Sequence, residues 1–287
     1  ERDLKYISWS ERMKLTLHYT NLIQHIGKRM MLRQRVLATA MTYFQRFYAN
    51  NAYRDTDAYP VACTCLYLAA KVEETPHHLR TFVNETREYL KRRHTHSMLQ
   101  SSADIAELEI YLLEEMDFYM VLYHPYDLLT RLCDELQIPK SNLQTAWFVI
   151  NDSFRIDVCL RYPPHVITLA ALYMTCTLQP DEPNALATMA SPTTTTTNNN
   201  NTTATATTDP LPASLAERLR QWFAGVSTPL DKVAEVTQQL LNLYHVWDAY
   251  SEVEIPAILA RLRVASPTLE PISSKMEEGD DSMISDI

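Results

Sequence analysis

The residues best suited to metal chemistry in this chain are its histidines and acids, but their spacing does not form a metal site. Helical di-iron sites need two Glu-x-x-His pairs, and the one pair present, Glu74 with His77, has Pro76 in the turn between its members. His77-His78 and His94-Thr95-His96 lack a third ligand, and Asp280-Asp281 lacks further acids at helical spacing. No histidine precedes an aspartate, which excludes phosphohydrolases that use that dipeptide. The sequence predicts neither a metal nor a cofactor.

Phosphate loops and nucleophile turns depend on glycine, and this chain has only Gly27, Gly225 and Gly279. A Gly-rich phosphate loop or a Gly-x-Ser-x-Gly turn needs a denser set. Tight hairpins and doubly wound sheets also normally use more glycine. The sequence therefore predicts an all-helical protein that has no catalytic residues and is not an enzyme.

The net charge of −9 comes mainly from the C-terminal tail. Residues 264–287 hold six acids and one lysine, so the tail accounts for −5 and the rest of the chain for −4. Neither part has the positive field that nonspecific nucleic-acid binding requires. We expect no direct contact with nucleic acid.

The five cysteines, at positions 63, 65, 133, 159 and 176, lie within apolar helical patterns. This placement is typical of buried free thiols in a reducing compartment. The sequence shows no signal peptide and no long uncharged apolar run. We therefore expect a soluble intracellular protein without a membrane partner.

Lys71 ends the most apolar helical segment of the chain. Apolar residues recur there at steps of three and four, which predicts one buried helix face: Val61, Cys65, Leu68, Ala69 and Val72. Lys71 lies off this face at the C-terminal end, where a cation complements the helix dipole. Taken alone, Lys71 is expected to form an ordinary surface ion pair with Glu74. Glu109, taken alone, is expected to be an ordinary surface acid near Glu107.

Asn151-Asp152 interrupts the otherwise apolar helical pattern from Ala146 to Leu160. The residues alone leave two interpretations open. The pair could form a polar stripe facing solvent, or it could be buried and cap a neighbouring helix.

Helices must position these side chains, and the periodicity of the apolar residues predicts eleven helices. The first begins after Ser8 or Ser10, with Ser10 as the predicted N-cap, and ends with Gly27 as its predicted C-cap. A helix with Pro60 in its first turn carries Lys71. The others are predicted at 32–50, 78–93, 102–119, 126–136, 141–160, 164–178, 214–224, 229–248 and 253–262.

These helices are predicted to form two similar sets of five. Leu66-Tyr67 and Leu172-Tyr173 occupy similar places in the third helix of each set. We predict domains at 1–123 and 124–250, followed by a short helix and a disordered acidic tail at 251–287. The Thr/Asn-rich stretch 181–212 is predicted to be a disordered insertion in the second domain.

Several segments, in this order, resemble the cyclin family, and within it the cyclins that serve the kinase module of the Mediator complex. The matching segments are Leu32–Ala40 with Tyr43–Tyr48, Leu68–Glu74, Tyr123–Tyr126, Ala146–Asp157, Tyr162–Pro164 and Arg220–Ala224. The resemblance covers nearly the whole chain except the Thr/Asn-rich stretch and the tail. It implies a fold of two tandem five-helix cyclin boxes. The chain begins after the N-terminal helix of these relatives, so any contact made by that helix is not expected here.

The resemblance also implies sites and partners. Lys71 and Glu109 match the two residues with which cyclins contact their kinase. Asn151, Asp152 and Tyr244 match a groove that faces another Mediator subunit. The implied partners are a cyclin-dependent kinase of the Mediator kinase module and other subunits of that module, in the nucleus. The implied function is activation of a serine/threonine kinase that regulates transcription by RNA polymerase II.

Three alternatives stay open. Another transcriptional cyclin, similar to cyclins H, K or L, would act by the same mechanism on a different kinase. A DNA-binding cyclin fold similar to general transcription factor IIB predicts a basic face, which the acidic charge balance disfavours. A helical metalloenzyme predicts stoichiometric metal, which the ligand spacings disfavour.

Overall fold

The computed structural model describes residues 2–92, 101–178 and 215–264, and within them every regular element is helical. The helices are α1 (Trp9–Arg29), α2 (Gln34–Asn50), α3 (Ala58–Val72), α4 (Leu79–Arg92), α5 (Ser102–Glu115), α6 (Tyr126–Glu135), α7 (Lys140–Ser153), α8 (Val158–Arg161), α9 (Pro164–Leu178), α10 (Leu215–Gly225), α11 (Leu230–Asp248) and α12 (Ile255–Val264). The prediction of an all-α fold is confirmed for this part of the chain. The predicted disordered insertion 181–212 and the tail beyond 264 lie outside the described residues.

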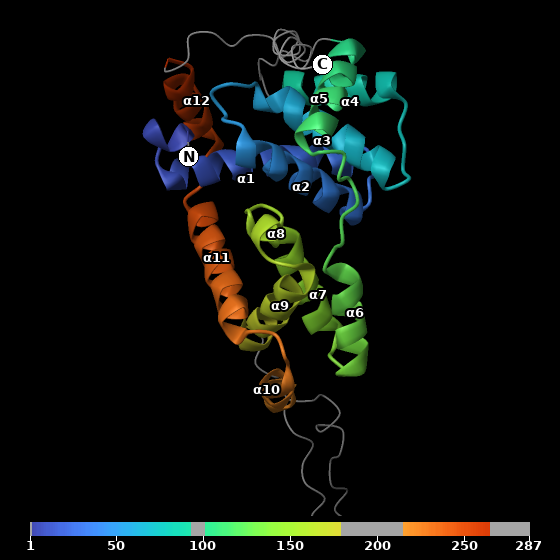
Figure 1. Ribbon diagram of the computed structural model, residues 1–287, viewed down its shortest axis with the longest axis vertical. Helices are drawn as coiled ribbons and strands as arrows, with labels where there is room; N and C mark the ends of the chain where they lie inside the picture. Colours follow the sequence, from blue (N-terminus) through green and yellow to red (C-terminus); the bar gives the residue numbers. More distant parts are fainter. Residues whose placement is uncertain (1, 93–100, 179–214, 265–287) are drawn as a thin grey trace, which may run out of the picture.

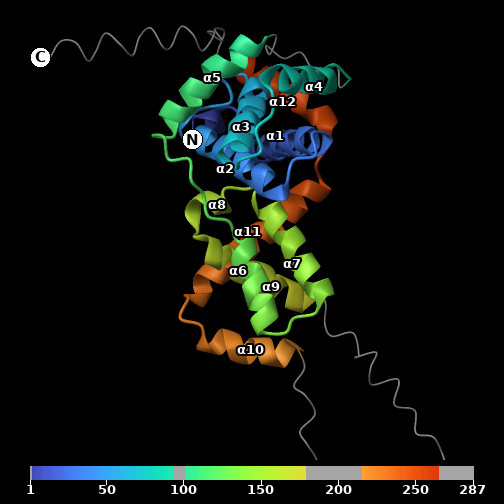
Figure 2. The same ribbon diagram turned by 90° about the vertical axis from the view of Figure 1, so that its right-hand side faces the viewer.

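The helices form two groups, α1–α5 and α6–α11, stacked end to end (Figures 1 and 2). The second group contains the short helix α8 in addition to its five longer helices. Helix α12 returns to the first group and packs on α1. The division after residues 123 and 250 stays a prediction, and this packing ties part of the predicted third segment to the first helix group.

Helix α3 is the central element of the first group. It packs against α1, α2 and α5, and from Ala58 to Ala70 only Tyr67 is not buried. The Asp57 side chain accepts a hydrogen bond from the amide of Tyr59 at 3.1 Å and so caps the N-terminus. Because the rest of the helix is buried, it reaches the surface mainly at its C-terminal end, where Lys71 lies.

Helix α1 corrects two details of the sequence prediction. Its N-cap is Ser8 and not Ser10, because Ser8 and Glu11 form a reciprocal capping box. Gly27 lies inside the helix and is not a C-cap. A Cβ atom at Gly27 would collide with the side chain of Leu37, so glycine allows α1 and α2 to approach closely.

The single helix predicted over 141–160 is two helices. Helix α7 ends at Ser153, and a turn closed by the hydrogen bond from the Arg155 amide to the Asp152 carbonyl (2.9 Å) precedes α8. This turn directs the Arg155 side chain into the interior between the two helix groups, where only 3% of the residue is exposed. The apolar periodicity continues across the turn, so the sequence pattern gave no sign of it.

Candidate partner-binding surfaces

Lys71 at the end of α3 forms an ion pair with Glu109 of α5. The Lys71 side chain is 45% exposed and that of Glu109 is 16% exposed. The ammonium group also lies 5.6 Å from the ring centre of Tyr67. The carboxylate that Lys71 reaches is therefore Glu109, on another helix, and not the neighbouring Glu74. An ammonium has three N–H donors, so the pair leaves Lys71 able to donate to a partner.

Buried polar contacts hold the backbone just beyond Lys71 in place. The Glu73 carboxylate accepts a hydrogen bond from the Thr39 hydroxyl at 2.7 Å and lies 3.5 Å from the Arg35 guanidinium. The next residue, Glu74, adopts a positive φ of 54°, and the amide of Thr75 donates back to the Ala70 carbonyl at 2.9 Å. The end of α3 is thereby closed and anchored on α2.

His124 extends this network into the segment that joins the two helix groups. Its Nε2 lies 2.8 Å from the Thr39 hydroxyl and 3.8 Å from Glu73. Burial lowers the pKa of His124 to about 4, and the charge of Arg35 adds to this effect, while Glu73 and Asp127 oppose it. Because the Thr39 hydroxyl proton goes to Glu73, the neutral imidazole donates its Nε2–H to Thr39. The sequence pattern around His124 gives no indication of this contact.

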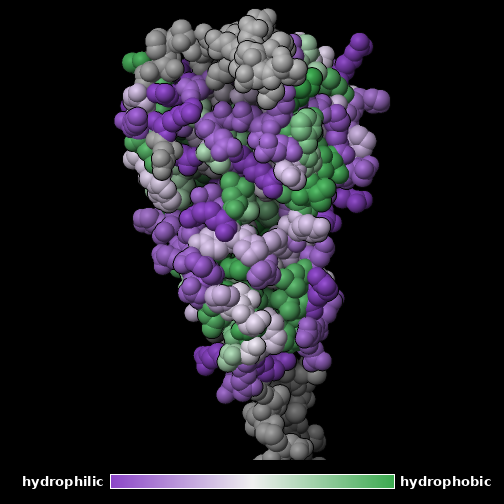
Figure 3. Space-filling view, in the orientation of Figure 1, coloured by the Kyte–Doolittle hydropathy of each residue, from purple (hydrophilic) through white to green (hydrophobic). Residues whose placement is uncertain are grey.

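Exposed apolar side chains occur on α5, directly after Glu109, and on the segment that follows α5, and apolar surface is visible among the polar residues of the first helix group (Figure 3). These side chains are all more than half exposed: Ile110, Phe118, Tyr119, Val121 and Tyr123. The backbone beneath them is fixed to α2, because the Tyr43 hydroxyl donates to the Met120 carbonyl at 2.5 Å and Arg46 donates to the Tyr119 carbonyl at 2.8 Å. Exposed apolar side chains on an anchored backbone are typical of a protein-binding surface.

The other three residues singled out by sequence lie in the second helix group. The Tyr244 hydroxyl of α11 donates to Asp152 of α7 at 3.2 Å. Asn151 instead accepts from the Tyr126 hydroxyl at 3.0 Å. All three are partly exposed. The structure thus brings Asp152 and Tyr244 together, with Asn151 beside them on α7, and keeps them separate from the Lys71–Glu109 pair.

Arg155 connects this second set to the first helix group. Its Nε donates to Asp152 at 3.4 Å, and its two terminal nitrogens donate to the side chains of Asn21 and Gln24 on α1. The guanidinium lies 4.4 Å from the Trp247 ring centre. Burial raises the pKa of Asp152 even though the Arg155 charge opposes it. Asp152 is therefore part of a half-buried charged network, which neither sequence interpretation of Asn151-Asp152 described fully.

The described residues contain no cluster of three or more histidine, cysteine or acidic side chains placed to hold a metal ion. Within the same residues, none of the helices combines the length and the apolar character that crossing a bilayer requires.

The chain is similar in sequence to known proteins along nearly its whole length. A family model described as "Cyclin, N-terminal domain" matches residues 4–121. The chain is 33% identical over 285 residues to Cyclin-C of Rattus norvegicus, which covers 97% of this chain and 88% of that protein. It is 32% identical over 252 residues to the RNA polymerase II holoenzyme cyclin-like subunit of Emericella nidulans, covering 86% of this chain and 82% of that protein.

Two solved structures have a similar fold. A chain in the structure of the CAK complex from Chaetomium thermophilum bound to ATP-gamma-S superposes with a TM-score of 0.63 at 16% identity, covering 98% of this chain and 82% of that chain. A chain in the cryo-EM structure of the yeast TFIIK (Kin28/Ccl1/Tfb3) complex superposes with a TM-score of 0.55 at 19% identity, covering 82% of this chain and 87% of that chain. At these identities the likeness concerns the fold alone.

Proposed function

The chain belongs to the cyclin family, whose members are regulatory and not catalytic, and we propose that it activates a cyclin-dependent serine/threonine kinase that regulates transcription by RNA polymerase II. The sequence similarity to a cyclin-like subunit of the RNA polymerase II holoenzyme supports this assignment. We place the chain in the nucleus, within the kinase module of Mediator.

The observation that carries the proposal is the Lys71–Glu109 pair, of which Lys71 is half-exposed, together with the exposed apolar side chains of α5 and the segment after it. The end of a helix presents backbone groups without intrahelical partners. The free donors of Lys71 can bind the unpaired carbonyls of a helix C-terminus, and Glu109 can accept a hydrogen bond from a cationic side chain beside it. Ile110 and the exposed side chains after α5 would cover the apolar face of the same kinase helix.

Activation then follows from binding alone. A kinase is active when its own Lys–Glu pair and its metal-binding aspartate are in place, which depends on the position of its C-helix. A rigid surface that binds the inward position more tightly shifts the kinase toward the active state. A shift from 1:99 to 99:1 requires a difference in binding free energy of about 5.5 kcal/mol. This chain supplies binding free energy and performs no chemical step.

Asn151, Asp152 and Tyr244 form the second part of the proposal. We assign their exposed atoms to a groove that contacts another subunit of the kinase module. The network with Arg155 supports this role, because it holds the Asp152 and Tyr244 side chains in fixed positions on two helices.

The test is reconstitution with the cognate kinase and the other module subunits. The double substitution Lys71→Ala/Glu109→Ala should weaken kinase binding and lower its activity, each by at least tenfold. The matched control is Lys232→Ala/Glu235→Ala, which removes an exposed ion pair on α11. Equal binding and activation by both double variants would refute the kinase site. Asn151→Ala should leave kinase binding intact and weaken recruitment of the other subunit, and unchanged recruitment would refute the groove.

A further inference from the structure

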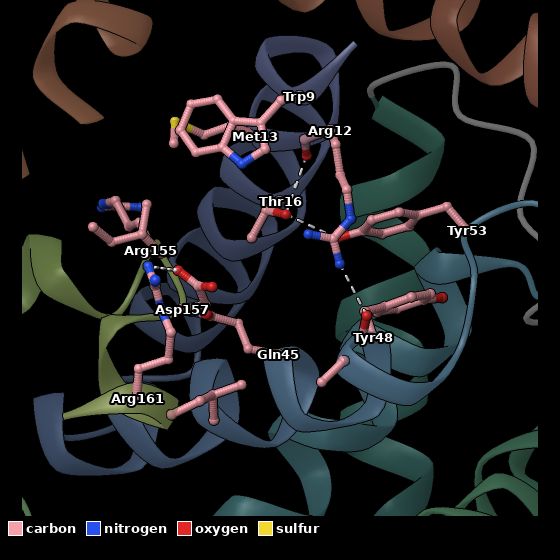
Figure 4. A pocket seen from close by; sticks show the side chains of 13 residues that line it. Trp9, Arg12, Met13, Thr16, Gln45, Tyr48, Tyr53, Arg155, Asp157 and Arg161 are labelled. Carbon is pink, nitrogen blue, oxygen red and sulfur yellow. Dashed lines mark hydrogen bonds and ion pairs between the residues drawn. The ribbon is translucent and has the colours of Figure 1, made fainter. Parts of the chain in front are cut away.

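A pocket of about 250 Å³ lies between the two helix groups, and neither candidate surface includes it as a binding site. It is open to solvent on one side and is bordered by α1, α2, the loop after α2, the turn that leads into α8, and α8 itself. Trp9 and Met13 lie on one side of it and Gln45 on the opposite side, while Arg12 and Asp157 face each other across it (Figure 4).

Two polar groups in this pocket are poorly satisfied. The amide nitrogen of Gln45 donates to the Phe154 carbonyl at 2.6 Å, but its buried Oε1 accepts no hydrogen bond from any described residue. The Arg12 guanidinium donates to the Tyr48 carbonyl at 3.1 Å and makes no ion pair within the described part of the chain. A buried acceptor and a half-buried cation both gain from a ligand that brings an N–H donor and an anion.

The remaining charges also favour an anion. Arg155 and Arg161 line the pocket together with Arg12, against the single carboxylate of Asp157. Arg161 is paired with Asp157 at 3.0 Å, and Arg155 with Asp152. These pairs leave Arg12 as the lining cation without an anionic partner.

The apolar part of the lining fits a side chain next to the acidic group. The exposed half of Trp9, with Met13, Ile156 and Leu160, provides this wall. A segment of peptide with an acidic residue beside an aliphatic residue or a methionine satisfies all three features. Its backbone N–H would donate to Gln45, its carboxylate would pair with Arg12, and its apolar side chain would pack on Trp9.

We propose that the occupant is the acidic tail of this chain, residues 276–286, and that the pocket is its intramolecular docking site. This segment holds five acids, flanked by apolar residues on both sides: Met276, Glu277, Glu278, Asp280, Asp281, Met283, Ile284 and Asp286. The proposal concerns a different part of the molecule from the kinase site and does not depend on the proposed function.

The position of α12 supports this occupant. Helix α12 packs on α1, which forms one wall of the pocket. Tyr53 lines both the pocket and the adjoining cleft that contains Arg263, and the last described residue is Val264. The last described turn of α12 therefore borders a cleft that shares Tyr53 with the pocket. Because an extended chain spans roughly 3.3 Å per residue, the 12 residues from 265 to 276 can span about 40 Å, which is long enough to reach the pocket.

Because the tail is tethered to the same chain, its effective concentration at the pocket is on the order of millimolar.

The fluorescence of Trp9 provides the first test, because the tail contains no aromatic residue. The measurement is acrylamide quenching of the full chain minus that of its Trp9→Phe variant, which isolates Trp9 from the other tryptophans. Neutralising the tail with Glu277→Gln, Glu278→Gln, Asp280→Asn and Asp281→Asn should raise the quenching constant of Trp9 by about twofold. A control variant neutralises four exposed acids elsewhere: Glu107→Gln, Glu114→Gln, Asp134→Asn and Glu135→Gln. Equal quenching in the parent chain and the tail variant would overturn the proposal.

The second test adds a synthetic peptide of residues 274–287 to the full chain with the neutralised tail. The peptide should restore protection of Trp9, and Arg12→Ala should weaken its binding by about tenfold, the loss of one charge-assisted hydrogen bond. Arg131→Ala is the matched control, because Arg131 also donates only to a backbone carbonyl and lies outside the pocket. Equal peptide affinity for the Arg12 and Arg131 variants would place the tail elsewhere and overturn the proposal.

Discussion

Replacing Arg155 by methionine should destabilise this protein strongly, because the residue joins the two helix groups through buried polar contacts. Methionine keeps much of the side-chain volume and removes the charge. The substitution leaves Asp152 without its cation and leaves Asn21 and Gln24 without their shared donor.

The magnitude follows from the burial of Arg155 and Asp152. Removing one partner of a buried ion pair typically costs about 3–5 kcal/mol, because the other charge stays buried without compensation. Asp152 retains the hydrogen bond from Tyr244, and its side chain is 23% exposed, so we expect a loss near the lower limit, about 3 kcal/mol. Most of this loss should disappear when Asp152→Asn removes the uncompensated charge, so the double variant is expected to be more stable than Arg155→Met alone.

The assay is urea unfolding of the parent chain, the two single variants and the double variant. The expected coupling free energy between the two positions is at least 1 kcal/mol. The loss caused by Arg155→Met should also shrink as the pH falls. Without the cation, the folded-state pKa of Asp152 rises further above its unfolded value, so lowering the pH protonates Asp152 in the folded state first and stabilises it. If Arg155→Met lowered the free energy of unfolding by less than about 1 kcal/mol, or by the same amount in the Asp152→Asn background, the assigned coupling between Arg155 and Asp152 would be refuted.

Two further stability predictions follow from buried residues of the first helix group and its junction. His124 has a folded-state pKa of about 4, below its ordinary value of 6.5, so the unfolded chain binds more protons between these pH values. Stability should therefore be retained above pH 6.5 and fall by on the order of 3 kcal/mol as the pH decreases to 4, and a His124→Gln variant measured by urea unfolding should lack this part of the pH dependence. Gly27→Ala should destabilise by about 1–3 kcal/mol through the collision with Leu37, whereas Gly225→Ala, with no atom within 4 Å of the added Cβ, should be neutral or slightly stabilising. Thermal unfolding of both variants provides the comparison, and equal melting temperatures would contradict the role assigned to Gly27.

The helices could be predicted from sequence because their apolar periodicity and capping residues are local signals. The bounds of α2, α9 and α11 lie within two residues of those predicted. The direction of Arg155 could not be predicted, because the turn after Ser153 contains neither glycine nor proline and the apolar pattern continues through it. Gly27 was assigned to a cap because a close approach between two helices has no local signature.

For the candidate sites too, single residues could be recognised from local sequence, whereas contacts between distant segments could not. Lys71 was noticeable as one charge at the end of an apolar helix, but its contact with Glu109 joins residues 38 positions apart, and only the family resemblance connected them. The polar network of Thr39, Glu73 and His124 brings together three segments of the chain. Each of these residues is unremarkable in its own segment, so spacing alone could not reveal the network.

Helix α2 makes the two candidate surfaces parts of one rigid frame. Its Thr39 binds Glu73 and His124, and its Tyr43 binds the Met120 carbonyl, so one helix positions both the end of α3 and the segment that carries the apolar surface. Its Gln45 donates to the Phe154 carbonyl, next to Arg155, and thereby contacts the second helix group. Buried and partly buried hydrogen bonds therefore connect the Asp152–Tyr244 surface, through Arg155 and the neighbouring Phe154, to the helix that supports Lys71. A subunit bound at the second surface would bias the proposed kinase-binding site only if these bonds had two arrangements, and their location in or beside a packed core favours one. We therefore expect the two partners to bind additively, with the chain acting as a fixed support for both.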